Sequence, residues 1–222
     1  MLSVITKTIK MMIKHTKEKF SQFSKIPRLN LINSCTGYKS ANLIATKSAD
    51  GISNVAVFSS VTHLGSDPAL LGFILRPNTV PRDTYTNLKE TGFFTVNAIT
   101  ENMISAAHQS SAAYDASISE FEMTDLEEEY LDQIEFPFVK GSPVRLLCRY
   151  VNEYPITENN TIHIIAAIEA IYYDSVLERE DKWLQLDKVN VVTINGLDGY
   201  SLPKHLNRFE YARVNQELKT KF

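Results

Sequence analysis

Hydrophobic and polar positions follow two different patterns along the 222-residue chain. Up to about Ser24, apolar residues such as Ile5, Ile9 and Phe20 recur at roughly helical spacing, with lysines between them. After Pro27 the pattern changes to short runs rich in Val, Ile, Phe and Thr that are separated by turn residues, which is typical of antiparallel strands. The pattern predicts a surface helix followed by a mainly β domain.

The strand candidates lie on both sides of a polar middle section. They are residues 29–33, 41–48, 53–60, 69–76 and 93–99 in the first half, then 144–154 and 161–174. Residues 191–194 and 208–214 add either two short strands or a strand and a tail. Ala49-Asp50-Gly51 predicts a tight hairpin, because Asp and Gly tolerate the positive φ of such a turn.

Two polar segments interrupt the β pattern. Residues 81–92 predict a short helix that Gly92 closes, and residues 101–133 alternate Ala, Ser and acidic side chains at helical spacing. The chain has no internal repeat and no shift in composition that would mark a boundary. We therefore predict one domain over residues 26–222, preceded by a helical extension over residues 1–25.

Composition excludes several classes of protein. An apolar content of 44% supports a sizeable core, and a net charge of -3 argues against a general nucleic-acid or membrane-surface binder. Lysines interrupt the apolar runs near the N-terminus, so we expect neither a targeting signal nor a membrane span. Cys35 and Cys148 are too few for a disulfide scaffold or a thiolate zinc site, which favours the cytoplasm.

The common catalytic motifs are absent from the sequence. There is no Gly-x-Gly-x-x-Gly, no Gly-Lys-Ser/Thr loop, no Gly-x-Ser-x-Gly and no His-Glu-x-x-His. The five histidines are scattered without the spacing of metal ligands, so we predict no metal site.

The most informative stretch runs from Asn54 to Asn97. One strand ends on the hydroxyls and backbone amides of residues 59–62, and a helix then begins near Arg82 and Thr84. A helix N-terminus offers unpaired N–H groups and a partial positive charge, so these residues predict a phosphate site without a glycine-rich loop. The carboxylate of Asp83 would repel a phosphate, and we expect it to turn away, either capping the helix or pairing with Arg82.

Several blocks occur in one order along the chain: Ile26-Pro27-Arg28, the run from Asp50 to Ser60, the run from Arg82 to Leu88, Thr91 to Asn97, Ala166-Ala167-Ile168-Glu169-Ala170, and Arg208 to Arg213. Together they resemble the flavin reductase-like family of FMN-binding split barrels. The chain departs from the family's usual Ala-Arg-Pro ending, since it reads Ala212-Arg213-Val214.

The resemblance implies a six-stranded antiparallel Greek-key split barrel with peripheral helices, a homodimer, and one noncovalent FMN per subunit near the dimer interface. It implies that the isoalloxazine and ribityl chain lie against Ser59, Ser60, Val61 and Thr62. The phosphate end matches Arg82, Thr84 and Thr86. Asn87 also matches the family pattern, although its simpler role is to tie the helix to a neighbouring loop. His163 and Tyr200 are further candidates for the site, with His163 as the candidate catalytic residue.

The activity that the resemblance implies is hydride transfer from NADH or NADPH to flavin N5, with electrons passing on to free flavin, oxygen, a redox partner or a monooxygenase. Two alternatives stay open. One is a flavoredoxin-like electron carrier without nicotinamide activity, and the other is a split barrel without flavin that acts as a binding or interaction module. Trp183 is expected at a surface or dimer contact, and residues 101–133 would cover the flavin face.

Overall fold

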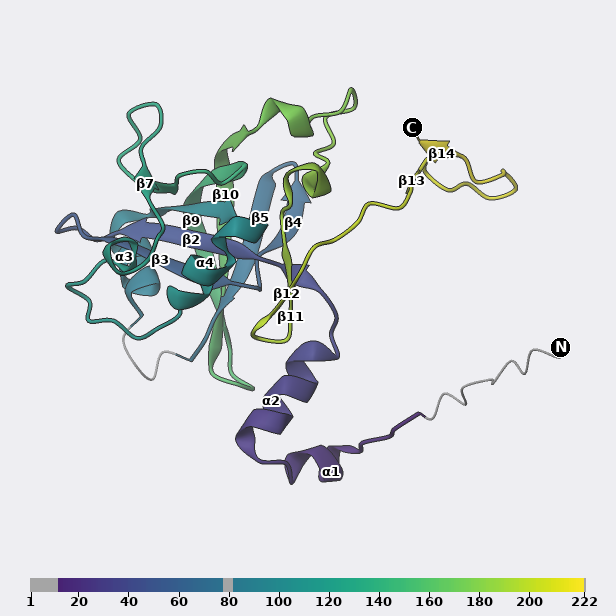
Figure 1. Cartoon of the computed structure of the whole chain (residues 1–222), viewed down its shortest axis with the longest axis horizontal. Coiled ribbons are helices and arrows are strands. Elements are labelled where there is room, and N and C mark those ends of the chain that lie inside the picture. Colours follow the sequence, from purple (N-terminus) through teal and green to yellow (C-terminus); the bar gives the residue numbers. More distant parts are fainter. Residues whose placement is uncertain (1–11, 78–81, 222) are drawn as a thin grey trace, which may run out of the picture.

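The computed structural model describes residues 12–77 and 82–221. Its main feature is a seven-stranded antiparallel sheet in the order β3-β2-β6-β9-β10-β5-β4 (Figure 1). The strands of this sheet are β2 (Asn42–Lys47), β3 (Ser53–Phe58), β4 (Thr62–Ser66), β5 (Ala69–Leu75), β6 (Phe93–Ala98), β9 (Val144–Ile156) and β10 (Thr161–Tyr173). The mainly β split-barrel class predicted from the sequence is confirmed, with one strand more than expected.

Smaller elements surround the sheet. The helices are α1 (Lys17–Ser21), α2 (Lys25–Ser34), α3 (Asp83–Thr91), α4 (Ile104–Gln109) and α5 (Glu120–Met123), with short 3₁₀ turns η1 (Glu101–Met103), η2 (Ser175–Leu177) and η3 (Leu186–Val189). The short strands are β1 (Lys39–Ser40), β7 (Glu128–Glu129), β8 (Phe138–Val139), β11 (Thr193–Asn195), β12 (Gly199–Ser201), β13 (Arg208–Phe209) and β14 (Thr220–Lys221). No helix among the described residues is long and apolar enough to cross a membrane.

A side chain joins the segment after β3 to the strand β5. The Ser60 hydroxyl accepts from the Ile74 amide at 3.0 Å and donates to the Ile74 carbonyl at 3.3 Å. It therefore takes the place of a backbone pair where β3 has ended. The Ser40 hydroxyl donates to the Val61 carbonyl at 2.8 Å and fixes the next residue of the same segment.

The sheet has an apolar cluster on each face. The cluster inside the barrel joins the sheet to α3 and contains Ile44, Leu71, Phe73, Leu75, Leu88, Phe94, Val96, Cys148, Ile164 and Ala166. The cluster on the other face includes Leu43, Ala45, Val55, Ile99, Met103, Ala107, Phe121, Leu126, Val139, Val192 and Ile194. The segment between β6 and β9, which includes α4, α5 and β8, covers that second face.

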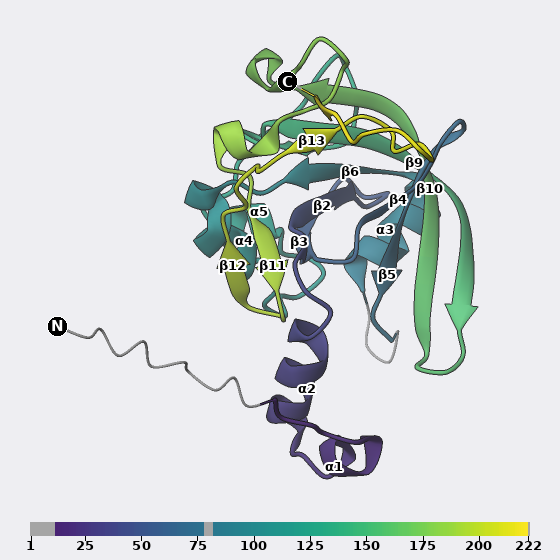
Figure 2. The same cartoon turned by 90° about the vertical axis from the view of Figure 1, so that its right-hand side faces the viewer.

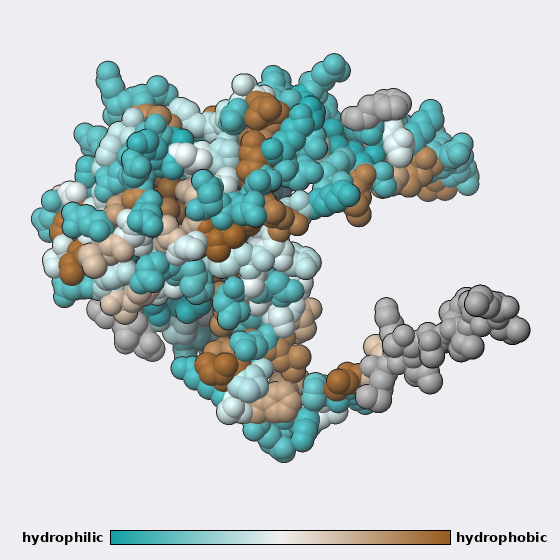
Figure 3. Space-filling model, in the orientation of Figure 1, coloured by the Kyte–Doolittle hydropathy of each residue, from teal (hydrophilic) through white to brown (hydrophobic). Residues whose placement is uncertain are grey.

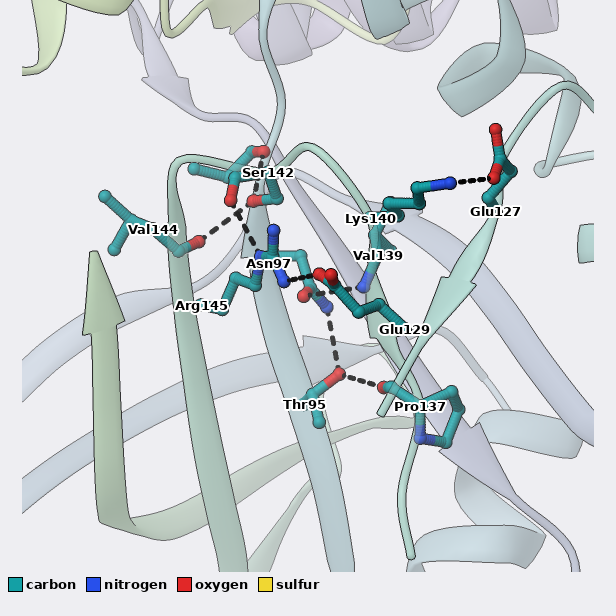
Figure 4. A network of polar contacts seen from close by, with 11 residues as sticks. Thr95, Asn97, Glu127, Glu129, Pro137, Val139, Lys140, Ser142, Val144 and Arg145 are labelled. Atoms are coloured by element: carbon teal, nitrogen blue, oxygen red, sulfur yellow. Dashed lines mark hydrogen bonds and ion pairs between the residues drawn. The ribbon is translucent and has the colours of Figure 1, made fainter. Parts of the chain in front are cut away.

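Asn97 fastens the end of this covering segment to the sheet (Figure 4). Its Nδ2 donates to the Leu43 carbonyl at 3.2 Å and to the Thr95 hydroxyl at 2.9 Å, and its Oδ1 accepts from the Val139 amide at 3.0 Å. The Thr95 hydroxyl in turn donates to the Pro137 carbonyl at 2.7 Å. Asn97 is fully buried, and each of its partners is neutral. We call this group of contacts the Asn97 anchor.

The turn and helix predictions near the site are confirmed. Gly51 has φ +89° and its amide donates to the Ser48 carbonyl at 3.0 Å, which closes the β2–β3 hairpin. Gly92 ends α3 in the left-handed region at φ 76°, with its amide donating to the Leu88 carbonyl at 3.0 Å. Glycine adopts both conformations without the clash that a Cβ would cause.

The N-terminal prediction needs correction. Residues 29–33, predicted as a strand, belong to α2, which begins at Lys25. Pro27 lies in the first turn of this helix, where a missing N–H costs little, and the Asn33 side chain donates to the Leu29 carbonyl one turn earlier. The helix expected up to Ser24 is reduced to α1 among the described residues, and residues 1–11 lie outside them. Figure 2 shows both helices projecting from the barrel.

Other boundaries also differ. Residues 62–66, which were not among the predicted strands, form the exposed edge strand β4, which follows β3 closely and pairs with β5. Residues 101–133 hold only short helices, and their end forms β7. The C-terminal strand predicted at residues 191–194 is shifted to β11, and the strand predicted at residues 208–214 is reduced to β13. β13 pairs with β14 in a hairpin that stands away from the barrel (Figure 1).

Candidate functional site

The strand end after β3 presents backbone groups more than side chains. Within the described residues, the amides of Ser59, Ser60 and Val61 have no backbone hydrogen-bond partner. The Ser60 hydroxyl is used by Ile74, and the Val61 side chain packs on the cluster inside the barrel. Thr62 opens β4 opposite Gly72 and is exposed. This segment can therefore donate hydrogen bonds from its backbone to a ligand.

Arg82 occupies the N-cap position of α3 in an extended conformation. Its Nε is buried without a hydrogen-bond partner among the described residues. The Arg82 carbonyl accepts from the amides of Tyr85 and Thr86 at 2.9 and 3.0 Å, and the amides of Asp83 and Thr84 have no backbone partner among the described residues, as is usual at a helix start. An orphaned guanidinium N–H beside free helix amides suits an anion.

Asp83 does not have the partner expected from the sequence. It provides no side-chain cap, and no ion pair joins it to Arg82 among the described side chains. Its charge instead helps to raise the pKa of Glu120, so the prediction of capping or pairing with Arg82 was wrong.

Thr84 and Asn87 both point from α3 into a buried polar network. The Thr84 hydroxyl donates to Asn54 Oδ1 at 3.0 Å, and Asn87 Nδ2 donates to the Thr46 hydroxyl at 3.0 Å. The Thr46 hydroxyl donates to the same Asn54 oxygen at 3.3 Å. The helix is thereby tied to β2 and β3, which agrees with a positioning role for Asn87.

Glu120 completes this network, and sequence reasoning missed it. Its carboxylate accepts from Asn54 Nδ2 at 2.9 and 2.8 Å and from the Val55 amide at 3.0 Å. Only 6% of the residue is exposed, and desolvation raises the pKa of its carboxyl group. An acidic residue in a largely polar segment gives no sign of burial except the apolar Phe121 beside it. We call the contacts that Glu120 and Asn54 make the Glu120 network.

Ser59 and Arg82 lie at different points along the site. Thr84 is bonded to Asn54, which precedes Ser59 by five residues of strand and turn, roughly 17 Å in an extended chain. The helix start and the strand end thus suit the opposite ends of an elongated ligand that carries an anionic group at one end.

The remaining candidates lie apart from these two ends. Thr86 is exposed on α3. His163, on β10, lies over Gly72, where a Cβ would meet its Nε2 at 2.5 Å, so only glycine fits beneath the ring. Tyr200 belongs to the separate β1-β11-β12 sheet, and its hydroxyl lies 3.2 Å from His108 Nδ1. The structure therefore does not bring His163 and Tyr200 together with Arg82 through any contact among the described residues.

One hollow in the described part of the structure lies away from these residues. A hollow of about 420 Å³ lies beside η1 and η3, and it is lined by Thr100, Glu101, Asn102, Gly141, Pro143, Asp174, Val189 and Asn190. None of the residues predicted for the site lines it. The described part of the chain contains no cluster of three or more His, Cys, Asp or Glu side chains that could hold a metal ion.

Comparison with known proteins gives a family match, similar solved structures and curated relatives. The model of the flavin reductase like domain matches residues 38–186. A structure from Shewanella frigidimarina NCIMB 400, assigned as a flavin reductase with split barrel domain, has 38% identity and a TM-score of 0.87, and the match covers 90% of this chain and all of that one. Nitrilotriacetate monooxygenase component B from Bacillus cereus shares the fold at 18% identity and a TM-score of 0.76, over 88% of this chain and 98% of that one.

A curated relative has no assigned activity. The uncharacterized protein BH2278 of Halalkalibacterium halodurans is 33% identical over 115 residues, which cover 51% of this chain and 55% of the relative. The family match and the Shewanella structure together define the class: the chain belongs to the flavin reductase-like domain family, in its split-barrel form. The resemblance predicted from the sequence is confirmed.

Proposed function

We propose that this protein is an FMN-binding flavoprotein that acts as an NAD(P)H-dependent flavin reductase. Membership of the flavin reductase-like family supports a flavin-related oxidoreductase. The single observation that carries the choice of a flavin mononucleotide is the buried Arg82 Nε at the start of α3, which has no hydrogen-bond partner among residues 12–77 and 82–221 and fits a phosphate.

The residues fit the two ends of such a cofactor. Arg82 and the free amides at the start of α3 would hold the phosphate, while Thr84 and Asn87 keep the helix in place. The unpaired amides of Ser59, Ser60 and Val61 would donate to the polar edge of the ring system. When bound, FMN supplies a hydride acceptor at its N5 atom, so no protein nucleophile is required.

The proposal extends to the assembly and its location. A second copy of the chain is the proposed partner, because the C-terminal arm (residues 202–221) exposes large apolar side chains: Leu206 is 79% exposed, Tyr211 90% and Val214 88%. Figure 3 shows apolar surface on this arm and on α2, with open space between them. The free cysteines agree with a cytoplasmic location, and the acceptor would be free flavin, oxygen, a redox partner or a monooxygenase.

The test is a visible spectrum of the protein after loading with FMN and gel filtration, followed anaerobically while NADH and then NADPH are added. A retained yellow band that bleaches with one of the nucleotides is the expected result. A retained band that neither nucleotide bleaches would make the protein an electron carrier. Loss of all colour on the column would contradict FMN as a bound cofactor and leave flavin as a transient substrate or the barrel as an interaction module.

A further inference from the structure

Glu120 is a buried carboxylate without a cation. It comes from α5, in the segment between β6 and β9, and its hydrogen bonds come from Asn54 Nδ2 and the Val55 amide. No ion pair involves it among the described residues, and Asp83 adds a second negative charge nearby. Burying a charged group in this way is costly, so its presence needs a reason beyond packing.

The carboxylate determines how the Asn54 amide is oriented. Both of its oxygens accept from Nδ2, which leaves Asn54 Oδ1 facing the hydroxyls of Thr84 and Thr46. A flipped amide would place Oδ1 against the carboxylate and leave both hydroxyls facing N–H groups. Glu120 therefore fixes the acceptor that Thr84 uses.

Thr84 is the second residue of α3 and follows Arg82 and Asp83 directly. The residue is buried, with 6% of its surface exposed, and the contact of its hydroxyl with Asn54 fixes the first turn of the helix against β3. That turn carries the free amides and the orphaned Arg82 Nε. Glu120 acts on the candidate phosphate site through two hydrogen-bonded neighbours.

We propose that Glu120 is a positioning residue, which sets the first turn of α3 to bind the phosphate of a flavin mononucleotide through Asn54 and Thr84. This inference rests on the proposed function. The segment between β6 and β9 would then contribute to phosphate recognition through Glu120, and it also covers one face of the sheet.

The test compares affinities for FMN and riboflavin, which differ only in the phosphate. In Glu120→Gln, one amide N–H would face Asn54 Nδ2, so we expect FMN affinity to fall about tenfold while riboflavin affinity stays within about twofold. Glu120→Asp, which keeps the carboxylate, should recover part of the loss. Glu129→Gln is the matched control, since Glu129 is a carboxylate of the same segment that pairs with Arg145 instead, and it should change neither affinity.

Other outcomes overturn the inference. Equal losses for FMN and riboflavin would give Glu120 a structural role only, and unchanged FMN affinity would remove it from the site. If the wild-type protein binds FMN no better than riboflavin, or binds neither, the proposed phosphate site itself fails. If the wild type prefers FMN over riboflavin and Glu120→Gln keeps the same preference, the role of Glu120 is overturned while the proposed phosphate site stands.

Discussion

Asn97 and Asn54 both fasten the segment between β6 and β9 to the sheet, but with different chemistry. The Asn97 anchor uses backbone groups and the Thr95 hydroxyl, all neutral, and holds Val139 near the end of the segment. The Glu120 network uses a carboxylate that has no counter-charge, and it continues into α3. Figure 4 shows the neutral anchor with the ion pairs Arg145–Glu129 and Lys140–Glu127 at its edge, where Arg145 also donates to the Ser142 carbonyl.

The two groups of contacts have different roles: the Asn97 anchor stabilises the fold, and the Glu120 network positions the candidate site. Neutral groups that satisfy each other stabilise a packed segment without dependence on pH. A buried carboxylate costs desolvation energy and is tolerated where its orienting effect matters. The comparison predicts that damage to the Asn97 anchor lowers stability alone, whereas damage to the Glu120 network also changes ligand preference.

The largest effect is expected for Asn97→Ala. The change leaves the Val139 amide and the Leu43 carbonyl without their side-chain partner in the core and opens a small cavity, so the free energy of unfolding should fall by about 3 kcal/mol. Urea unfolding measures this loss. The ratio of FMN to riboflavin affinity should stay at the wild-type value in the folded variant, and a changed ratio would remove the distinction between the two groups.

Glu120→Ala should lower stability by about 2 kcal/mol, and the loss should depend on pH. Burial raises the pKa of Glu120 above its usual 4.5, so this group stabilises the fold fully below that value and loses the contribution as pH rises through the folded pKa. The variant should therefore be more strongly destabilised near pH 4.5 than at about pH 8. Unfolding curves at the two pH values decide this, with Asn97→Ala as the control whose loss stays constant.

Thr84→Val removes the link between the network and α3 while keeping the size of the side chain. We expect a loss of about 1 kcal/mol in stability, because Asn54 Oδ1 keeps Thr46 as a donor. FMN should bind more weakly, with riboflavin affinity unchanged, as in Glu120→Gln. Fluorescence titrations with both flavins measure this. Affinities equal to those of the wild type would show that Thr84 does not link the Glu120 network to the phosphate site on α3.

The smallest effect on the barrel is expected for Arg208→Ala in the C-terminal arm. Arg208 stacks on Trp183 at 4.2 Å and donates to both carboxylate oxygens of Asp181, which lowers the pKa of Asp181 to about 2. Trp183 is the only tryptophan, so its emission should shift when the arm is released while barrel unfolding stays the same.

Acid should act on the same contact. The contact exists above the usual Asp pKa of 3.8 and is lost as pH falls through about 2, so wild-type Trp183 emission should change over this range. A Trp183 signal that is equal in wild type and Arg208→Ala would contradict docking of the arm through this pair.

Much of the fold was predictable because its signals are local. The runs at residues 53–58 and 93–98, the Gly51 turn and the Gly92 helix end each follow from nearby side chains. Residues 29–33 were wrongly predicted as a strand because a short apolar alternation also fits a helix when no strand is available to pair with it. The strand β4 was not predicted because its residues, as in other exposed edge strands, are mostly exposed.

The site was predictable only in part. Residues 59–62 and Arg82 stood out as a strand end and a helix start close together in the sequence. Glu120 lies 66 residues from Asn54, and apart from the apolar Phe121 nothing beside it in the sequence marks a carboxylate that will be buried against a distant strand. Contacts of this kind exist only after the sheet and the covering segment have packed.

The account depends most directly on a phosphate that binds at the start of α3. We would titrate wild-type protein and Arg82→Ala with FMN and riboflavin and compare the four dissociation constants. The account predicts that wild type binds FMN more tightly than riboflavin by about tenfold or more, and that Arg82→Ala loses most of this preference while still binding riboflavin. Equal affinity of the wild type for the two flavins would contradict it.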